Sequence, residues 1–450
     1  MRYFLDPFGC AKNQVDAENM MAHLNNAGWS AVDSENAINA DLIIINSCGF
    51  IQSAKQESIN AVLAWRRQYP GKKILLAGCL AQRYAQELST SLPEADGFFG
   101  INDITKIVDT AEAIVGNGED ALLSACEPSV RCSLLPVSSR PLLSPPGSAY
   151  IKISEGCNNR CSYCAIPLIR GPLRCRSIAD ITEECRGLIA RGIKELCIIG
   201  QDIGSYSDNG SGLPQLLRAV AEIPGKFWVR LLYMHPGHFP LPIIDIMEND
   251  RRFLPYFDIP FQHASTRILS AMNRQGSAQE YIALASVIRG RLPAAVIRTT
   301  VLVGFPGETN EDFNALLDFQ AKLRPDWLGC FAYSREEDTP AYTMKGQVHK
   351  KTAAERKRTI EERQMPITEA NMDRFTGQTL DMLLEEQRPN PDVEAKPGTI
   401  WLGRLYCHAP EVDGIAVIPG SMIGAVRAGD ILSCKVTARH GFDLMCRIAE

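Results

Sequence analysis

Short apolar strand segments alternate with helical segments through most of the chain, and this alternation constrains the fold more than any other feature. The run Asp41-Leu-Ile-Ile-Ile-Asn46 is typical of a strand buried on both faces of a sheet. Strands that alternate with helices form parallel sheets covered by helices. We therefore predict that residues 1–126 form a doubly wound, flavodoxin-like α/β domain. Its strands are expected at 3–8, 41–46 and 73–77, and its helices at 15–27, 53–67, after Leu80 and at 103–115.

The same alternation resumes at residue 148, after a segment at 127–147 whose prolines and serines predict a linker. Six further strands separated by helices predict an open (β/α)6 barrel over residues 148–372, which ends in a charged helix. The chemistry of such barrels lies at the C-terminal ends of the strands. Residues 373–450 show short strands with Gly and Pro turns and predict a small antiparallel β-barrel. The strands of the larger barrel are expected at 149–153, 195–199, 229–232, 257–259, 296–303 and 327–331.

Composition narrows the function classes. The chain has 450 residues, 45% of them hydrophobic, which suits about three domains of roughly 150 residues. No run approaches the roughly 18 consecutive apolar residues of a membrane helix, and the first residues do not resemble a signal peptide. We therefore expect a cytoplasmic protein with no membrane partner. Fifteen cysteines in a reducing compartment favour metal binding over disulfides. A net charge of −5 argues against a protein whose main function is to bind nucleic acid.

Three cysteines lie in one short loop after the first barrel strand, in Gly156-Cys157-Asn-Asn-Arg-Cys161-Ser-Tyr-Cys164. With this cysteine content the spacing would arise by chance about 0.02 times per chain. Three thiolates on a tight loop can hold three irons of a 4Fe-4S cluster, and the fourth iron stays open for another ligand. Structural zinc is the alternative, but it needs a fourth ligand, for which Cys175 is the candidate.

This loop resembles the signature of the radical-SAM superfamily. The resemblance implies that the open iron binds S-adenosylmethionine (SAM) through its amino and carboxylate groups. It further implies that electron transfer splits SAM into methionine and a 5′-deoxyadenosyl radical, which removes hydrogen from an unactivated carbon. Tyr163 stands where the family usually has an aromatic residue beside the adenine, so it is expected to bind the cofactor. Packing beneath the loop is the alternative role for Tyr163.

A second set of cysteines is dispersed in the sequence but shares one context. Cys10, Cys48 and Cys79 each lie near the C-terminal end of a predicted parallel strand and precede a helix. In a doubly wound sheet these strand ends share one edge, so the three cysteines are expected to converge. Helix N-termini at that edge favour thiolates and a negatively charged cluster. The alternative is that all three are small buried residues.

Several longer motifs make the resemblance more specific. They resemble the methylthiotransferase family, and more narrowly its RimO branch, which acts on a ribosomal protein. The tRNA-modifying MiaB branch typically has a glutamine–methionine–asparagine run after the first cysteine, and this run is absent here. The matching segments are Gly9-Cys10-Ala-Lys12-Asn13-Gln-Val15-Asp16, Asn46-Ser-Cys48-Gly49-Phe50-Ile51, Ile166-Pro167 with Ile169-Arg170-Gly171, Asp258-Ile-Pro-Phe-Gln262-His263 and Arg298-Thr-Thr-Val-Leu-Val-Gly304-Phe-Pro306-Gly307-Glu308; the terminal barrel is similar to a TRAM domain.

The resemblance implies a second 4Fe-4S cluster on Cys10, Cys48 and Cys79, whose open iron carries the sulfur to be inserted. One SAM would methylate that sulfur, and a second SAM would supply the radical. The implied product is a methylthio group on the β-carbon of an aspartate in protein twelve of the small ribosomal subunit. Such a reaction also needs a low-potential electron donor and a sulfur source, and it meets nucleic acid only through the ribosome.

Further residues at strand ends are candidates for binding cofactor or substrate, and each has a plainer alternative. For the cofactor, the alternatives are a helix cap at Gln201 and a simple strand-to-helix turn from Gly304 to Glu308. For the substrate, the alternatives are a hydrogen-bonded loop histidine at His263, a solvated basic patch at Arg170 and a surface turn at Asp413. The expected cofactor-binding residues are Tyr163, Gln201, Gly304 and Glu308, and the expected substrate-binding residues are His263, Arg170 and Asp413.

The charge of the terminal segment bears on the substrate. Residues 374–450 contain eight Lys or Arg and ten Asp or Glu, a net charge of −2. A module that grips tRNA is expected to carry excess positive charge, whereas a slightly acidic one suits a basic ribosomal protein. A tRNA adenosine methylthiotransferase is therefore the second hypothesis. A non-catalytic iron–sulfur or zinc protein is the third.

Overall fold

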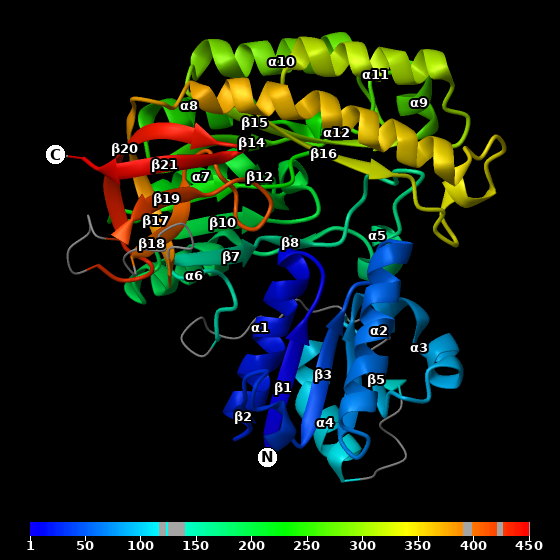
Figure 1. Ribbon diagram of the computed structural model, residues 1–450. Helices are drawn as coiled ribbons and strands as arrows, with labels where there is room; N and C mark the ends of the chain where they lie inside the picture. The colour runs from blue at the N-terminus through cyan, green and yellow to red at the C-terminus, as the bar shows by residue number, and fades with distance from the viewer. Residues whose placement is uncertain (117–122, 125–139, 390–397, 421–425, 450) are drawn as a thin grey trace.

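The computed structural model describes residues 1–116, 123–124, 140–389, 398–420 and 426–449 (Figure 1). Residues 127–139 of the predicted linker lie outside this part. The N-terminal segment forms the predicted parallel sheet, with strand order β2-β1-β3-β4-β5-β6, the flavodoxin-like arrangement. Its strands are β1 (Arg2–Pro7), β2 (Ser30–Ala31), β3 (Leu42–Ser47), β4 (Lys73–Gly78), β5 (Gly97–Phe99) and β6 (Leu123–Ser124), and its helices are α1 (Ala11–Asn26), α2 (Gln52–Gln68), α3 (Cys79–Ser91) and α4 (Ile107–Val115).

The central segment is the predicted open barrel of six parallel strands, in the order β7-β10-β13-β14-β15-β16. Alternate residues of these strands pack outward against the helices, as Ile151 and Leu196 do. The strands are β7 (Ser148–Lys152), β10 (Glu195–Ile199), β13 (Trp228–Leu231), β14 (Phe253–Asp258), β15 (Val296–Val303) and β16 (Trp327–Ala332). The helices are α5 (Ile166–Arg170), α6 (Ile178–Ala190), α7 (Leu213–Ala221), α8 (Pro242–Asn249), α9 (Thr266–Ala271), α10 (Ala278–Arg291), α11 (Asn310–Leu323) and α12 (Lys350–Asp373). Short two-stranded sheets join β8 (Ser154–Glu155) to β9 (Arg174–Cys175), and β11 (Ser207–Asp208) to β12 (Ser211–Gly212).

The C-terminal segment closes into a five-stranded barrel in the order β17-β18-β19-β21-β20. Most neighbours are antiparallel, as predicted. The exception is β19, which pairs with β21 instead of with β20, the next strand along the chain, and β19 and β21 run parallel. This small barrel packs on the inner face of the large one, where Trp401 and Leu405 share a core with Tyr150 and Tyr256. Its strands are β17 (Thr379–Pro389), β18 (Thr399–Leu405), β19 (Ala416–Pro419), β20 (Ile431–His440) and β21 (Asp443–Ile448).

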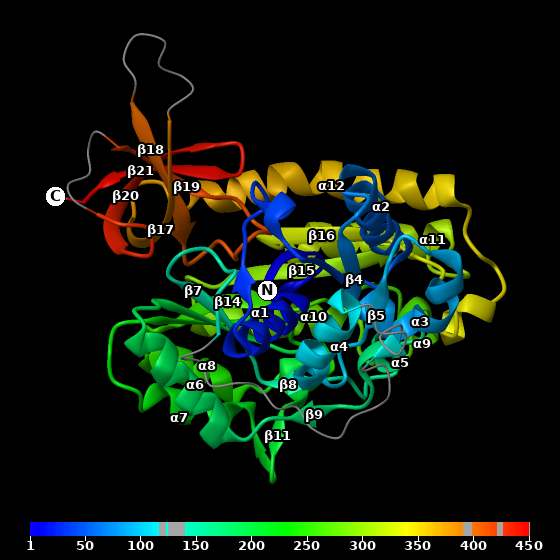
Figure 2. The ribbon, with the colours of Figure 1, turned by 90° about the horizontal axis from the view of Figure 1, so that it is seen from below.

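The N-terminal domain covers the other part of the opening of the large barrel. Helix α1 packs against β7, and its residues Ala11 and Val15 enter the same inner core. Figures 1 and 2 show the doubly wound sheet on one side of the barrel, the small β-barrel at a different side, and α10 to α12 along the outer surface. Within the described residues, no helix is long and apolar enough to cross a membrane.

Candidate active site between two cysteine triads

The three dispersed cysteines converge at the C-terminal edge of the N-terminal sheet, as predicted from their strand ends. Cys48 directly follows β3, and Cys79 directly follows β4. Glycines let the loops approach closely, because a Cβ atom on Gly9 would lie 3.2 Å from the Cβ of Cys48, and one on Gly49 would lie 2.6 Å from the carbonyl oxygen of Cys79. We call Cys10, Cys48 and Cys79 the N-terminal triad.

Charge at the N-terminal triad differs from one thiol to the next. Burial raises the pKa of Cys10, but Lys12, Arg170 and backbone N–H groups outweigh it and leave that pKa lowered. Burial raises the pKa of Cys48, and it raises the pKa of Cys79 to about 12. The Arg170 Nη2 donates a hydrogen bond of 3.1 Å to the Cys79 Sγ. A guanidinium at this distance stabilises a thiolate, which is the form that binds iron.

The second triad, Cys157, Cys161 and Cys164, lies in the loop after β8, and we call it the barrel triad. Gly156 starts the loop at φ +74°, where a Cβ atom would lie 2.2 Å from the carbonyl oxygen of Pro172. The Cys157 N–H donates to the Gly171 carbonyl at 3.2 Å, so the loop is folded back on itself. All three cysteines remain partly exposed. The chain therefore presents three accessible thiols on one rigid loop.

Arg274 beside the barrel triad was missed from the sequence. Its side chain is 7% exposed, and its Nη1 points at the Cys161 Sγ at 3.8 Å while its Nη2 donates 2.6 Å to the Pro260 carbonyl. Each triad thus has one buried arginine directed at one of its sulfurs. The signal for Arg274 in the sequence is weak, since it lies 110 residues beyond the cysteine loop.

The donor sets of both triads fit 4Fe-4S clusters. Each triad supplies three thiols and a neighbouring guanidinium, which suits a cube that takes one thiolate per iron and carries negative charge. Among the described residues, no three His, Cys, Asp or Glu side chains are grouped closely enough to hold a single metal ion.

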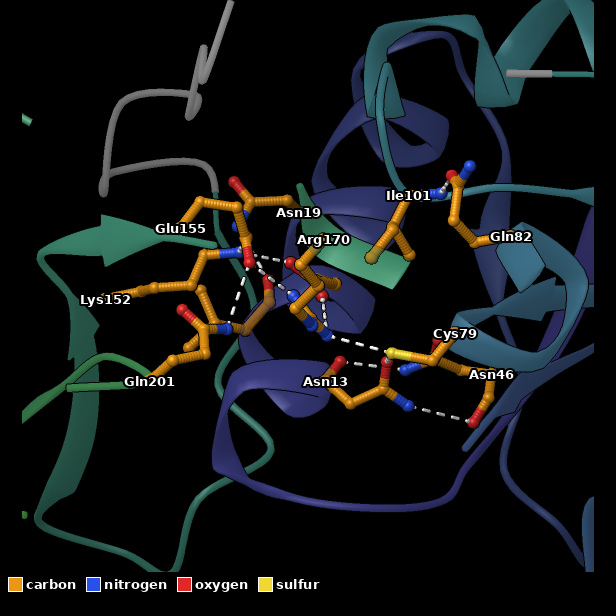
Figure 3. Close-up of polar contacts among 12 residues, drawn as sticks. Asn13, Asn19, Asn46, Cys79, Gln82, Ile101, Lys152, Glu155, Arg170 and Gln201 are labelled. Carbon is orange, nitrogen blue, oxygen red and sulfur yellow. Dashed lines mark hydrogen bonds and ion pairs between the residues drawn. The ribbon is translucent and has the colours of Figure 1, made fainter. Parts of the chain in front are cut away.

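A buried ionic network crosses the domain interface beside Cys79 of the N-terminal triad (Figure 3). Arg170, on the helix after the barrel triad, pairs with Asp16 of α1 at 2.9 Å and with Glu155 at 2.8 Å. Lys152 at the end of β7 pairs with the same two carboxylates, at 2.6 Å in the case of Glu155. The Gln201 Nε2 donates 3.1 Å to Glu155. We call the four charged residues the interdomain clamp.

Arg170 is buried in the clamp and is not part of a solvated basic patch, which was the alternative considered from the sequence. Its side chain is only 2% exposed, and Lys152 and Asp16 are as deeply buried. Because Arg170 is six residues beyond Cys164 and bonds to Cys79, it touches the N-terminal triad from the loop that carries the barrel triad. Further contacts hold the same interface, including ion pairs of 2.9 Å from Lys55 and Arg83 to Glu336.

Lys12 lies beside the clamp, two residues beyond Cys10. Its side chain is 8% exposed, and its Nζ sits 3.2 Å from the centre of the Tyr233 ring. Burial lowers the pKa of Lys12, while the nearby Cys10, Asp258 and Glu155 oppose that effect. Tyr233 has φ +67°, a left-handed conformation at the end of β13 that aims its ring at the interface.

The predicted residues His263, Gly304 and Glu308 form one buried cluster. The His263 Nε2 lies 3.6 Å from Glu308, and both side chains are fully buried. Glu308 also pairs with Arg356 of α12 at 3.3 Å and accepts a hydrogen bond from the Gly304 N–H. A Cβ atom on Gly304 would lie 2.5 Å from Ala353, so the approach of α12 by itself requires this glycine.

Asp413 does not lie on an exposed substrate-facing turn, contrary to the expectation from the sequence. Its side chain is 1% exposed and pairs with Arg298 at 3.4 Å, and Tyr256 donates it a hydrogen bond of 2.6 Å. Burial raises the pKa of Asp413 to about 6, against the opposing effect of Arg298. The residue therefore anchors the small barrel to the large one. A sequence pattern cannot distinguish such a turn from a surface turn.

A polar group beside the cysteine loop links Asn159, Asp202 and His238. Asp202 accepts hydrogen bonds from Asn159 at 2.9 Å and from the His238 Nδ1 at 2.7 Å. Burial alone would raise the pKa of Asp202, but these hydrogen bonds lower it, and the same contact raises the pKa of His238. Tyr163 packs nearby with its ring edge-on to Phe305, at 6.5 Å between ring centres.

Family comparisons match three parts of the chain. Residues 2–100 match the family described as Uncharacterized protein family UPF0004, residues 151–319 match the Radical SAM superfamily, and residues 376–448 match the TRAM domain.

Curated relatives match over the full length. A protein of Treponema denticola is 44% identical over 98% of this chain and 99% of its own length, and one of Thermotoga maritima is 37% identical over 99% of each. Both are named ribosomal protein uS12 methylthiotransferase RimO.

Solved structures share the fold at low identity. The radical S-adenosylmethionine methyltransferase TsrM from Kitasatospora setae, with cobalamin and a 4Fe-4S cluster bound, is 16% identical, covers 76% of each chain and gives a TM-score of 0.56. The cobalamin-dependent S-adenosylmethionine radical enzyme OxsB is 11% identical over 80% of this chain and 56% of its own, with a TM-score of 0.52. These likenesses show the architecture alone.

Proposed function

The chain belongs to the RimO family of radical-SAM methylthiotransferases, and from this premise we propose that it attaches a methylthio group to the β-carbon of an aspartate in ribosomal protein uS12. The observation that carries the proposal is the contact that Arg170 of the barrel makes with the N-terminal triad. This residue follows the barrel triad in sequence and bonds to a sulfur of the N-terminal triad. Two sulfur-rich sites that face one interface suit a reaction that needs both a radical and a sulfur donor.

Membership of the radical-SAM superfamily implies an iron–sulfur cluster and SAM. In this proposal Cys157, Cys161 and Cys164 hold that cluster, and Cys10, Cys48 and Cys79 of the N-terminal domain (residues 1–126) hold a second one. When bound, the first supplies radical chemistry with SAM and the second supplies the sulfur that is inserted.

The chain's own residues keep the two triads in a fixed relation. The interdomain clamp is buried, and removing one partner of a buried ion pair leaves an uncompensated charge that costs about 3–5 kcal/mol. Replacing one clamp residue by a neutral one is therefore expected to disturb the interface around Arg170. Arg170 and Arg274 each hold positive charge beside one thiolate, which favours retention of a negatively charged cluster.

The remaining site residues are proposed in supporting roles. Gln201 bonds to Glu155 of the clamp and reaches the strand end next to the barrel triad, which supports a place at the SAM side. Tyr163 packs under the cysteine loop against Phe305. His263 and Glu308, both fully buried, support the turn after β15 from behind instead of contacting a protein substrate.

The proposal also assigns residue ranges to the domains and names the partners of the reaction. Residues 148–372 form the radical-SAM barrel, residues 127–147 connect it to the N-terminal domain, and residues 373–450 form the TRAM barrel. The net charge of −2 over residues 374–450 supports a basic protein as partner. A low-potential electron donor and a source of sulfur complete the set of partners.

The test uses the full chain, reconstituted anaerobically with iron and sulfide. It is incubated with SAM, sulfide and a reductant, in one arm with small ribosomal subunits and in another with tRNA. Mass spectrometry of proteolytic peptides is expected to find a methylthio group on one aspartate of uS12 and none on nucleosides. Modified tRNA with unmodified uS12 would assign the chain to the tRNA branch, and no product in either arm would overturn the proposal.

A further inference from the structure

One charged side chain in the interface has no bonded partner. Lys12 is 8% exposed, and its ammonium rests on the face of the Tyr233 ring. Within the part of the chain that the structure describes, no residue accepts a hydrogen bond from this ammonium or forms a carboxylate ion pair with it. Burying a cation without a partner is costly, so such a residue points to a counter-charge that arrives with a ligand.

The acids around Lys12 are already engaged by other cations. Asp16 and Glu155 are shared between Lys152 and Arg170, two carboxylates for two cations. Lys12 is the additional cation of this group, and the charge that attracts it most strongly is that of Cys10, which is a thiol and not a carboxylate.

Asp258 also contributes an attractive charge, but its oxygens are occupied. One accepts a hydrogen bond of 3.1 Å from the Tyr233 N–H, and the other pairs with Arg298 at 3.3 Å. The position of the Lys12 ammonium over the ring is thus held by Tyr233 and not by an acid. The three N–H groups of the Lys12 ammonium therefore remain free to donate hydrogen bonds to a ligand.

The interface is open at the neighbouring residue. Cys10, two residues before Lys12, is the exposed member of the N-terminal triad, whereas Cys79 is buried. The Lys12 nitrogen is itself not among the fully buried polar atoms that lack a partner. A ligand that approaches the exposed side of this triad therefore meets a lysine whose donors are unused.

We propose that Lys12 binds the side-chain carboxylate of the substrate aspartate and so selects an acidic residue for modification. The inference rests on the proposed function and names the group that recognises its target. The β-carbon to be modified is bonded directly to the carboxylate carbon, so a carboxylate-binding group belongs beside the triad proposed to carry the sulfur. The cation–π contact with Tyr233 keeps the ammonium in place before the substrate arrives.

The experiment is a double-mutant cycle on binding. The reconstituted full chain and its Lys12→Met variant, whose unbranched side chain is one atom shorter and uncharged, are titrated with labelled uS12 and with uS12 whose target aspartate is replaced by asparagine. The Kd is measured by fluorescence anisotropy with SAM present and no reductant. We expect Lys12→Met to weaken binding of the aspartate form by about 30-fold or more and to leave the asparagine form within about threefold.

Control variants separate recognition from a structural role. Lys55→Met removes a lysine at the same domain interface that already has a partner, Glu336 at 2.9 Å, and it should not change the preference for aspartate over asparagine. Lys12→Arg retains the charge and should restore part of that preference. Iron content and thermal unfolding of each variant are measured in parallel, and Lys12→Gln replaces Lys12→Met if the latter loses iron.

The outcomes are distinct. Equal weakening of both uS12 forms by Lys12→Met, or no weakening of either, overturns the inference. A changed reduction potential with an unchanged aspartate preference would assign Lys12 to charge compensation of the cluster instead. If the wild-type chain forms product on uS12 and Lys12→Met still prefers aspartate, only the inference fails. If the wild-type chain forms no product on uS12, the proposed function fails as well.

Discussion

The ion pairs that anchor the TRAM barrel predict a large loss of stability from one substitution, Glu195→Gln. Glu195 opens strand β10 and is fully buried between two arginines. Arg404 of the TRAM barrel pairs with it at 2.5 Å, and Arg230 of β13 pairs with it at 2.8 Å. The glutamine has nearly the same shape but carries no charge, so both guanidiniums lose their shared counter-ion inside the protein.

Two arguments give a similar magnitude for this loss. Removing one partner of a buried ion pair costs about 3–5 kcal/mol. Burial raises the pKa of Glu195, but Arg404 and Arg230 together lower it from 4.5 to about 2, which corresponds to roughly 3 kcal/mol in favour of the charged form. We therefore expect the free energy of unfolding to fall by about 3–4 kcal/mol at pH 7.

The same pKa fixes the sign of the pH dependence. Because the pKa is lower in the folded protein than in the unfolded chain, the stabilisation is present above pH 4.5 and is lost as the pH falls towards 2. The difference between wild type and Glu195→Gln should therefore shrink as the pH is lowered below 4.5. Urea unfolding followed by the fluorescence of Trp327 and Trp401, which lie at the interface of the two barrels, measures it.

The matched control is Glu385→Gln. Glu385 also bonds to Arg404, at 2.6 Å, but its side chain is 16% exposed and Arg404 retains Glu195 when Glu385 is neutralised. The control should cost less than about 1.5 kcal/mol. Equal losses in the two variants, or a loss below about 1 kcal/mol in Glu195→Gln at pH 7, would show that Glu195 does not hold the two barrels together through its charge.

Three further predictions concern the site. Cys48→Ala should halve the iron content after reconstitution and abolish methylthiolation while SAM cleavage persists, as measured by iron assay and chromatography; loss of both activities would contradict separate roles for the triads. Gly156→Ala should lower cluster absorbance more than Gly171→Ala, since both have positive φ, but only at Gly156 would the new methyl group meet a backbone carbonyl, at 2.2 Å. Asp202→Asn should lower the pKa of His238, because the hydrogen bond to Asp202 raises that pKa. The stabilisation from this contact is present below pH 6.5 and fades as the pH rises. NMR titration of His238 measures the change, and an unchanged pKa would argue against the contact.

Much of the fold was predictable from local periodicity. The strands at 195–199 and 296–303 have the predicted bounds, and the large barrel has the six parallel strands that strand–helix alternation predicted. Strand β14 begins at Phe253, four residues before the predicted start. The prediction began too late because Pro255 interrupts the apolar pattern of the strand. The short strands β2 and β5 were missed, since two or three residues carry no recognisable period.

Both cysteine triads can be found in the amino-acid sequence, because Cys10, Cys48 and Cys79 follow predicted strand ends and the other three cysteines share one loop. The three-part architecture can also be found there, since its periodicities are local properties of the chain. The charge contacts between domains arise only when the chain is folded. In the folded chain Arg170 bonds to Cys79 of the N-terminal triad, and Asp413 is buried in a domain contact. Lys12 contacts the Tyr233 ring and has no carboxylate partner among the described residues. These outcomes depend on which charges meet across packed domains. Contacts between residues more than 150 positions apart, such as the 154 positions between Asp16 and Arg170, leave no short-range pattern.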